Sequence, residues 1–306
     1  MKWLSRSRVI IVTLLTLLTG TSTIAQTHDE WAQTVNWDGI THWSDYIKST
    51  AGNMGPNALP VPFISNGSID SNIWAGATGH FHFRKGDQTQ NLALYANYCL
   101  VKDVVTVDFA FVPVEHFTMS DALKKERKVF YPRYYSRFAR GDVYMNGTVR
   151  IFRKWEKSIR MALRFGFRLP SSNQLEAARF TDNMGYHVDL SFGKPLSPHL
   201  KWIGMAGLYV WGMTGKSHRQ DDAFLFGTGL EWEKNGWKLQ GYTAGYLGYL
   251  QNSGDKPILL RTHTEKRFRN TSLLLRLQQG VQDFKYSSVE LGAKIFFKRQ
   301  APAITR

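Results

Sequence analysis

The stretch Ile159–Leu169, IRMALRFGFRL, decides the fold, because its side chains alternate in character with a period of two. All odd-numbered positions carry large apolar side chains, and the even-numbered positions carry Arg, Ala or Gly. A helix is the alternative, since Arg160, Arg164 and Arg168 recur every four residues. That helix would expose a wide apolar surface and place Phe-Gly-Phe against helix propensity. The alternation therefore predicts a β-strand.

Eleven further segments alternate in the same way, so the sequence predicts twelve strands. The other segments are Ile73–Phe83, Leu92–Leu100, Val105–Phe111, Val143–Phe152, Tyr186–Phe192, Trp202–Gly212, Phe224–Trp232, Trp237–Leu250, Ile258–Lys266, Ser272–Val281 and Ser287–Phe297. All ten prolines fall outside these segments, as expected for residues that cannot donate to a strand ladder.

The links between these segments alternate in length. Every second link is short, and Glu233–Gly236 contains Asn-Gly, the dipeptide favoured in two-residue hairpins. Most of the other links are longer, up to the loop Pro113–Arg140. Transmembrane β-barrels combine tight periplasmic turns with longer outer loops in this way, whereas a soluble β-sandwich or lipocalin-like barrel needs no such asymmetry. The predicted fold is therefore all-β: a closed antiparallel transmembrane β-barrel of about twelve strands, with its polar faces toward the lumen.

The composition excludes several other classes of protein. Aromatic residues make up 14% of the 306 residues, 26 are glycine, and the mean hydropathy is −0.32. A polytopic helical membrane protein would need several apolar runs of about 20 residues. The single cysteine, Cys99, excludes a disulfide framework and any multi-cysteine metal site. The net charge of +15 is compatible with nucleic acid, anionic lipid or an anionic solute as partner.

The N-terminus narrows this choice. Lys2, Arg6 and Arg8 precede the apolar run Val9–Leu18, and small residues lead up to Ala25. This pattern predicts a secretory signal peptide over residues 1–25 that is cleaved after Ala25. An exported protein is not expected to meet nucleic acid, and with the barrel it is expected in the cell outer membrane. The predicted organisation continues with an N-terminal segment at 26–71, the barrel at 72–298 and a tail at 299–306.

The segment before the barrel differs from the rest of the chain. It carries Trp31, Trp37 and Trp43 in a polar context, followed by the run Gly55–Pro62, GPNALPVP. Repeated Pro and Gly exclude a regular helix or a central strand there. The three Trp favour a docked segment, either a cap on the periplasmic mouth or a plug in the lumen; a flexible leader is the alternative.

Four short motifs resemble a family of exported proteins from Bacteroidetes-type bacteria. They are Gly55–Pro62, Gly141-Asp142, Ala178–Asp182 (ARFTD) and Gly185–Lys194 (GYHVDLSFGK). The resemblance is spread over most of the chain that follows the predicted signal peptide. It implies an outer-membrane location and a β-barrel fold, and it transfers no catalytic residue.

The strand register predicts a basic wall in the lumen. Its candidate residues are Arg150, Arg160, Arg164, Arg168, Arg261 and Arg276, and the same face carries the acids Asp108, Asp189, Glu231, Glu265 and Glu290. Arg and Lys lining a pore favour anions, which predicts a narrow channel or solute-uptake protein for small anionic solutes, surrounded by outer-membrane lipid. Internal ion pairing in a filled, structural barrel with functional outer loops uses the same residues and is the alternative. In that alternative the basic loop Pro113–Arg140, with Lys124 and Arg127, contacts anionic surface glycolipid.

Enzymatic and metal-binding arrangements find little support in the sequence. Ser65-Asn66-Gly67 matches part of a barrel-phospholipase pattern, but Phe63 stands where the histidine is needed. His80 and His82 share one strand face, yet lack a third ligand nearby in sequence, so polar lining of the lumen is the simpler interpretation. We predict no catalytic residue, no metal site and no cofactor.

Overall fold

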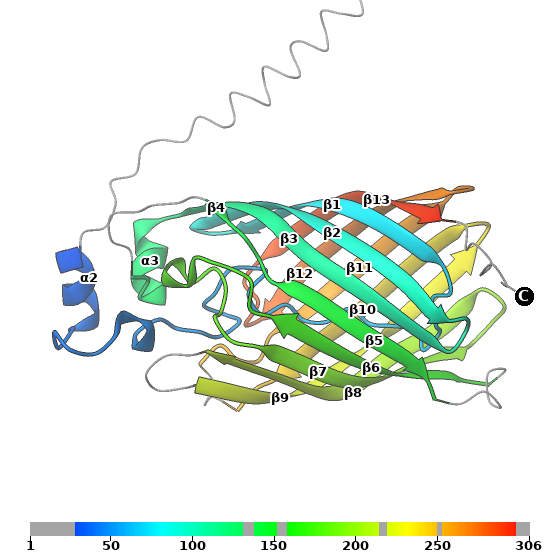
Figure 1. Ribbon diagram of the computed structural model, residues 1–306, viewed down its shortest axis with the longest axis horizontal. Helices are drawn as coiled ribbons and strands as arrows, with labels where there is room; N and C mark the ends of the chain where they lie inside the picture. Colours follow the sequence, from blue (N-terminus) through cyan, green and yellow to red (C-terminus); the bar gives the residue numbers. More distant parts are fainter. Residues whose placement is uncertain (1–27, 131–137, 152–157, 214–218, 250–252, 298–306) are drawn as a thin grey trace, which may run out of the picture.

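A computed structural model of the protein describes residues 28–130, 138–151, 158–213, 219–249 and 253–297. Twelve long antiparallel strands form its wall, as the sequence predicted (Figure 1). They are β1 (Ile73–Arg84), β2 (Asp87–Val101), β3 (Val105–Met119), β5 (Val143–Arg150), β6 (Arg160–Leu169), β7 (Gly185–Pro195), β8 (Leu200–Met213), β9 (Arg219–Lys234), β10 (Trp237–Leu247), β11 (Ile258–Arg267), β12 (Thr271–Gln282) and β13 (Ser287–Phe297).

The sheet closes on itself, because the first strand pairs with the last. β1 and β13 are antiparallel neighbours from Ile73 opposite Phe297 to Phe83 opposite Ser287. We call the end where β1 begins and β13 ends the short-turn end; its turns include residues 102–104, 196–199, 235–236 and 268–270. The opposite, long-loop end carries the β3–β5 and β6–β7 loops. Two links at the long-loop end are short, against the predicted asymmetry: residues 85–86 join β1 to β2, and residues 283–286 join β12 to β13.

Apolar side chains cover the outside of the barrel and charged ones line its inside. On β12, Leu273 and Leu277 are 57% and 45% exposed, whereas Arg276 between them is 7% exposed. On β6, Phe165 and Phe167 point outward while Arg164 and Arg168 are buried. A soluble protein shows the reverse distribution, so the outer belt is a lipid-facing surface and the chain is a transmembrane β-barrel.

Strands β2 and β3 extend well beyond their predicted bounds at the long-loop end. The prediction that every proline lies outside the strand interiors is wrong for Pro113, which lies inside β3, whereas Pro195 is the last residue of β7. The pairing of β2 with β3 shifts register there, with Leu92 opposite Val114 and Leu94 opposite Phe111. Pro113 therefore occupies a β-bulge, where its missing N–H breaks no regular ladder. Beyond it, β3 pairs with a two-residue strand, β4 (Phe138–Ala139), that the sequence did not predict.

Short helices lie at the long-loop end. α2 (His28–Val35) precedes the barrel, and α3 (Asp121–Arg127) belongs to the β3–β5 loop. Two 3-10 turns, η1 (Trp43–Asp45) and η2 (Leu175–Ala177), accompany them. In the described part of the chain, none of the helices has the length and apolarity needed to cross a bilayer.

Candidate functional site

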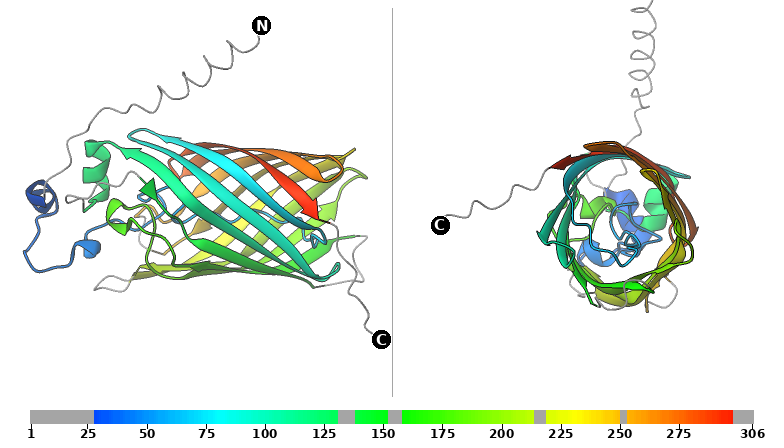
Figure 2. Two further views of the ribbon diagram at one scale, coloured as in Figure 1. Left: turned by 45° about the horizontal axis from the view of Figure 1, so that its top comes forward. Right: turned by 90° about the vertical axis from the view of Figure 1, so that its right-hand side faces the viewer.

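The N-terminal segment runs inside the barrel, from the long-loop end to the short-turn end. Figure 2, looking along the barrel axis, shows this segment enclosed by the ring of strands. Its middle part, Ala51–Ile64, is called the plug below. Six plug residues belong to one buried core with inward side chains of β8–β11, including Tyr209, Trp211 and Tyr246. The plug fills the half of the lumen that is closer to the long loops.

The plug offers the lumen fewer backbone donors than acceptors, because Pro56, Pro60 and Pro62 lack an N–H. The wall provides side-chain donors. Guanidinium and phenol groups donate to six carbonyls along the plug: Arg84 to Gly52 at 3.1 Å, Arg127 to Met54 at 3.1 Å, Tyr144 to Asn57 at 3.3 Å, Arg168 to Ala58 at 2.5 Å, Tyr246 to Leu59 at 3.1 Å and Arg261 to Val61 at 3.3 Å. These six side chains are called the lumen donors. They satisfy backbone acceptors that would otherwise be buried without partners.

A buried ion cluster lies beside the part of the plug that contains Met54 and Asn57. Asp87 accepts hydrogen bonds from Arg127 at 2.9 Å, Arg179 at 2.7 Å and the Tyr286 hydroxyl at 2.6 Å. Arg179 also donates to Glu115 at 2.8 Å, and all four charged side chains are fully buried. The amide of Asn57 donates to Glu115 as well, at 2.6 Å, so the cluster is bonded to the plug.

The motifs that carry the family resemblance meet at this place. Gly55 donates its N–H to the carbonyl of Ala178 at 2.8 Å, and a Cβ on Gly55 would lie 2.8 Å from the Arg179 guanidinium. Asp142 lies 3.7 Å from Arg168 Nε and also accepts the N–H groups of the 171–172 turn at 2.9 Å. These motifs thus place the plug against the β6–β7 loop.

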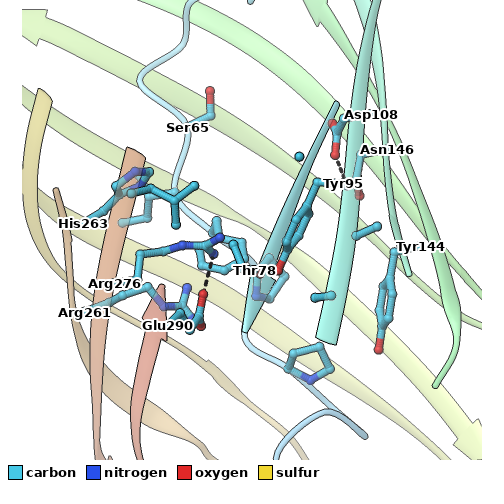
Figure 3. A pocket seen from close by; sticks show the side chains of 18 of the residues that line it. Ser65, Thr78, Tyr95, Asp108, Tyr144, Asn146, Arg261, His263, Arg276 and Glu290 are labelled. Atoms are coloured by element: carbon cyan, nitrogen blue, oxygen red, sulfur yellow. Dashed lines mark hydrogen bonds and ion pairs between the residues drawn. The ribbon is translucent and has the colours of Figure 1, made fainter. Parts of the chain in front are cut away.

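The lumen contains a cavity of about 670 Å³ that runs beside the plug, where Pro56 and Pro60 line it, and reaches the short-turn end. Phe63 is part of its lining, with the guanidinium groups of Arg261 and Arg276 at 4.1 and 4.3 Å from its ring centre. Arg276 pairs with Glu290 at 3.1 Å, and its guanidinium lies 5.6 Å from the ring centre of Tyr95 (Figure 3). Residues of the turn at Gly236, together with Arg160 and Arg267, surround the opening.

The structure places all six predicted arginines on the inward face of the wall. Arg160, Arg164, Arg168, Arg261 and Arg276 line the cavity, and Arg150 stands opposite the inward, fully buried Ala162 in the strand register. Two of them, Arg168 and Arg261, are lumen donors that hold the plug. That a lumen lined by these arginines conducts anions remains a prediction.

Most cationic side chains of the cavity have an anionic partner. Nine Arg and Lys line it, and six of these lie within 4.0 Å of a carboxylate: Arg164 (Asp189, 2.8 Å), Arg168 (Asp142, 3.7 Å), Lys201 (Glu231, 2.9 Å), Lys238 (Glu231, 3.1 Å), Arg276 (Glu290, 3.1 Å) and Lys294 (Glu265, 2.7 Å). The other three donate to neutral oxygens instead: Arg160 to Ser68, Arg261 to Gln278 and Arg267 to Asn72. The cavity wall is therefore charged but largely compensated.

The expectation about Lys124 and Arg127 needs revision. Lys124 and Arg127 were expected in a solvated outer loop that contacts glycolipid, but both are buried, at 2% and 0% exposure. Arg127 belongs to the ion cluster, and Lys124 pairs with Asp121 at 2.8 Å. His80 and His82 point inward and are hydrogen-bonded within the protein, His80 to Thr78 and His82 to Ser288 and Asn91.

Sequence reasoning missed the ion cluster and the tyrosine donors. Asp87, Glu115 and Arg179 lie outside the segments whose alternation was strongest, so no register assigned them to the lumen. One sign of the cluster was present in the sequence, because Arg179 belongs to the ARFTD motif that carries the resemblance.

Fold and lumen together define a twelve-stranded transmembrane β-barrel whose lumen is half filled by its own N-terminal segment. No family model matches the chain, and no characterised protein matches it by sequence. Solved structures match by fold. An outer membrane channel from Pseudomonas putida F1 has a TM-score of 0.56 and 11% identity, over 78% of this chain and 100% of the other.

Two further barrels align less closely. The KdgM porin has a TM-score of 0.48 and 7% identity, over 73% of this chain and 99% of the other. The translocator domain of the autotransporter NalP from Neisseria meningitidis has a TM-score of 0.44 and 9% identity, over 75% and 90%. The match to the Pseudomonas channel supports the fold of outer-membrane barrels that the resemblance implied. The bacterial group remains a prediction.

Proposed function

We propose that this protein is an outer-membrane channel for small polar solutes, and that the plug holds it in a closed state. The observation that carries the proposal is the cavity of about 670 Å³ beside the plug. That volume is typical of small-molecule sites, and it lies inside a closed barrel with access from the short-turn end. The cleavable export signal predicted for residues 1–25 and the lipid-facing belt support the location. By the usual asymmetry, short turns face the periplasm and long loops face outward.

Anionic solutes are the preferred class in this proposal. Compensated pairs contribute little net potential, so the preference comes from Arg160, Arg261 and Arg267, which donate to neutral partners. Two of them, Arg160 and Arg267, lie at the short-turn end, where the cavity opens.

A structural or interaction barrel is the second candidate. It is favoured by the packing of the plug, since residues from Ala51 to Ile64 share one core with the wall. In this alternative the plug stays in the lumen permanently, and the outer loops at the long-loop end perform the protein's structural or interaction role.

Planar-bilayer conductance separates the two candidates. We expect the full chain to show little or no steady conductance, and a variant lacking residues 28–64 to show open channels, because the plugged half of the lumen is then empty. A second variant, Arg168→Ala with Arg261→Ala, keeps the plug but removes two lumen donors, and is expected to show intermittent openings. Folding of each variant is checked by heat-modifiable migration on gels. A folded variant without the plug that does not conduct would favour the structural barrel.

A further inference from the structure

The direction in which the N-terminal segment passes through the barrel has a consequence for its topology. The segment meets elements of the long-loop end first. Trp31 donates from Nε1 to the Lys128 carbonyl at 3.2 Å, and Lys48 donates its N–H to the Arg127 carbonyl at 3.3 Å. Arg127 is the last residue of α3 and Lys128 follows it, so both carbonyls lie at the long-loop end. The segment therefore starts on the side where the long loops lie.

Later residues make contacts progressively closer to the other end. Gly52 donates to Gly254 in the β10–β11 loop at 2.8 Å, and Asn66 donates to Glu231 near the end of β9 at 2.7 Å. Ser71 then donates to Asp103, in the β2–β3 turn at the short-turn end, at 2.7 Å. The order of these contacts along the sequence matches their order along the barrel axis, so the chain crosses the whole lumen once.

The length of the segment permits this path. The twelve residues of β1 span about 40 Å at roughly 3.3 Å per residue. Residues 47–72 reach at most about 90 Å when fully extended, at roughly 3.3–3.6 Å per residue. The path is thus long enough to cross the barrel with turns to spare.

The start of the segment is docked at the long-loop end by aromatic packing. Trp31 is 1% exposed, and its ring centre lies 4.7 Å from that of Phe130 in the β3–β5 loop. Trp43 stacks on Phe130, with the ring centres 5.3 Å apart and the ring planes 10° from parallel. Ile47 joins a second buried core made by the long-loop elements, with Phe117, Leu123 and Phe180. This docking fixes α2 beside α3, as Figure 1 also shows.

We infer that the barrel displays its own N-terminal segment: α2 lies on the long-loop side of the membrane, opposite the side where the barrel strands begin and end. Given the outward orientation of the long loops in the proposed function, on which this part rests, that side is the cell surface. Assembly then requires the N-terminal segment to cross the membrane through the lumen as the barrel closes around it.

Cysteine labelling of intact cells tests this topology. Three single-cysteine variants are made in a Cys99→Ser background and treated with a membrane-impermeant maleimide, before and after the outer membrane is permeabilised. Gln33→Cys reports on α2, Ala122→Cys on α3, and Ser197→Cys on the short-turn end; all three side chains are exposed. We expect Gln33→Cys and Ala122→Cys to label on intact cells, and Ser197→Cys to label only after permeabilisation. Asp29→Cys, a second exposed position on α2, is expected to repeat the Gln33→Cys result.

Each alternative outcome has a distinct meaning. Labelling of Gln33→Cys only after permeabilisation, while Ala122→Cys labels on intact cells, overturns the inference and leaves the proposed orientation intact. If Ser197→Cys labels on intact cells and the other two do not, the surface display and the proposed orientation both fail. Equal labelling of all three variants would show that no membrane separates the two ends, which also overturns the inference.

Discussion

At the scale of single residues, the partners of a lumen charge decide what it does. Arg164 illustrates this, because its Nε donates to Asp189 at 2.8 Å, and Asp189 also accepts from Ser191 at 2.6 Å. Asp189 is 1% exposed. A guanidinium held in this way completes a buried polar network, and its removal would leave a carboxylate buried without its cation.

The first prediction follows from this pair. Arg164→Ala is expected to destabilise the barrel by about 3–5 kcal/mol, the range for breaking a buried pair by removing one partner. Adding Asp189→Asn should recover much of the loss, because the second change removes the orphaned charge. Unfolding by urea in lipid vesicles, followed by tryptophan fluorescence, measures both variants. Arg160→Ala serves as control, since Arg160 is exposed at the short-turn end and donates to a serine. Equal losses for Arg164→Ala and Arg160→Ala would contradict the pairing.

The residue joining the plug to β1 gives a second prediction. Gly67 has a φ of +70°, and a Cβ at this position would lie 2.3 Å from the carbonyl oxygen of Arg160. Gly67→Ala therefore combines a left-handed backbone with a backbone clash, and should cost at least about 1–3 kcal/mol. Gly147→Ala is the matched control on β5, because its Cβ would have no heavy atom within 4 Å. The same unfolding measurement applies, and similar stabilities for the two variants would count against the position of this turn.

At the scale of elements, the sequence predicts those strands in which apolar and polar side chains alternate regularly. All twelve long strands follow from alternation, because lipid on one side and a polar lumen on the other demand it at every second residue. The extension of β3 was missed because Pro113 signals the end of a strand unless a bulge accommodates it. β4 and α3 were missed because both lie in a loop, where local sequence carries no period.

The site was predictable only in part, for a related reason. Register identifies which side chains point inward, so the six arginines could be placed on the lumen wall. Register does not reveal what occupies the lumen. The carbonyls of Met54, Ala58 and Val61 that several donors bind belong to a segment without secondary structure. Their alignment with the wall depends on tertiary packing alone.

The docking of α3 provides a prediction about pH. Glu126 on α3 is bonded to Arg84 at 3.1 Å and to Lys285 at 3.2 Å. Burial raises the pKa of Glu126, but Lys285 and Arg84 outweigh this effect and hold the pKa below its usual value. A lowered folded-state pKa stabilises the docked state above the unfolded pKa, and this contribution is lost as the pH falls through the folded pKa. Protease sensitivity of the α3 loop should therefore rise at acidic pH. Glu126→Gln should weaken this dependence, and an unchanged pH profile in that variant would exclude Glu126 as its origin.

At the scale of the whole molecule, the lumen contains two unlike regions. One is packed by the plug, the lumen donors and the ion cluster, and resembles the core of a soluble protein. The other is a charged, largely compensated cavity that runs beside the plug and reaches the short-turn end. A channel built in this way is closed by its own chain rather than by a narrow wall, so its selectivity is measurable only once the plug is loosened or removed.

The last prediction concerns that selectivity. In the variant lacking residues 28–64, we expect a preference for anions, because Arg160 and Arg267 line the short-turn end of the cavity and donate to Ser68 and Asn72, which carry no charge. Arg160→Gln with Arg267→Gln should then shift the reversal potential across a salt gradient toward that of a non-selective pore. Lys125→Gln is the control, since it also removes positive charge, but from α3, outside the cavity. A reversal potential that moves equally for the control would assign the preference to the overall charge of the protein. Cation preference before any arginine is changed would rule out an anion path along this wall, because fixed positive charge in a confined pore raises the local concentration of anions.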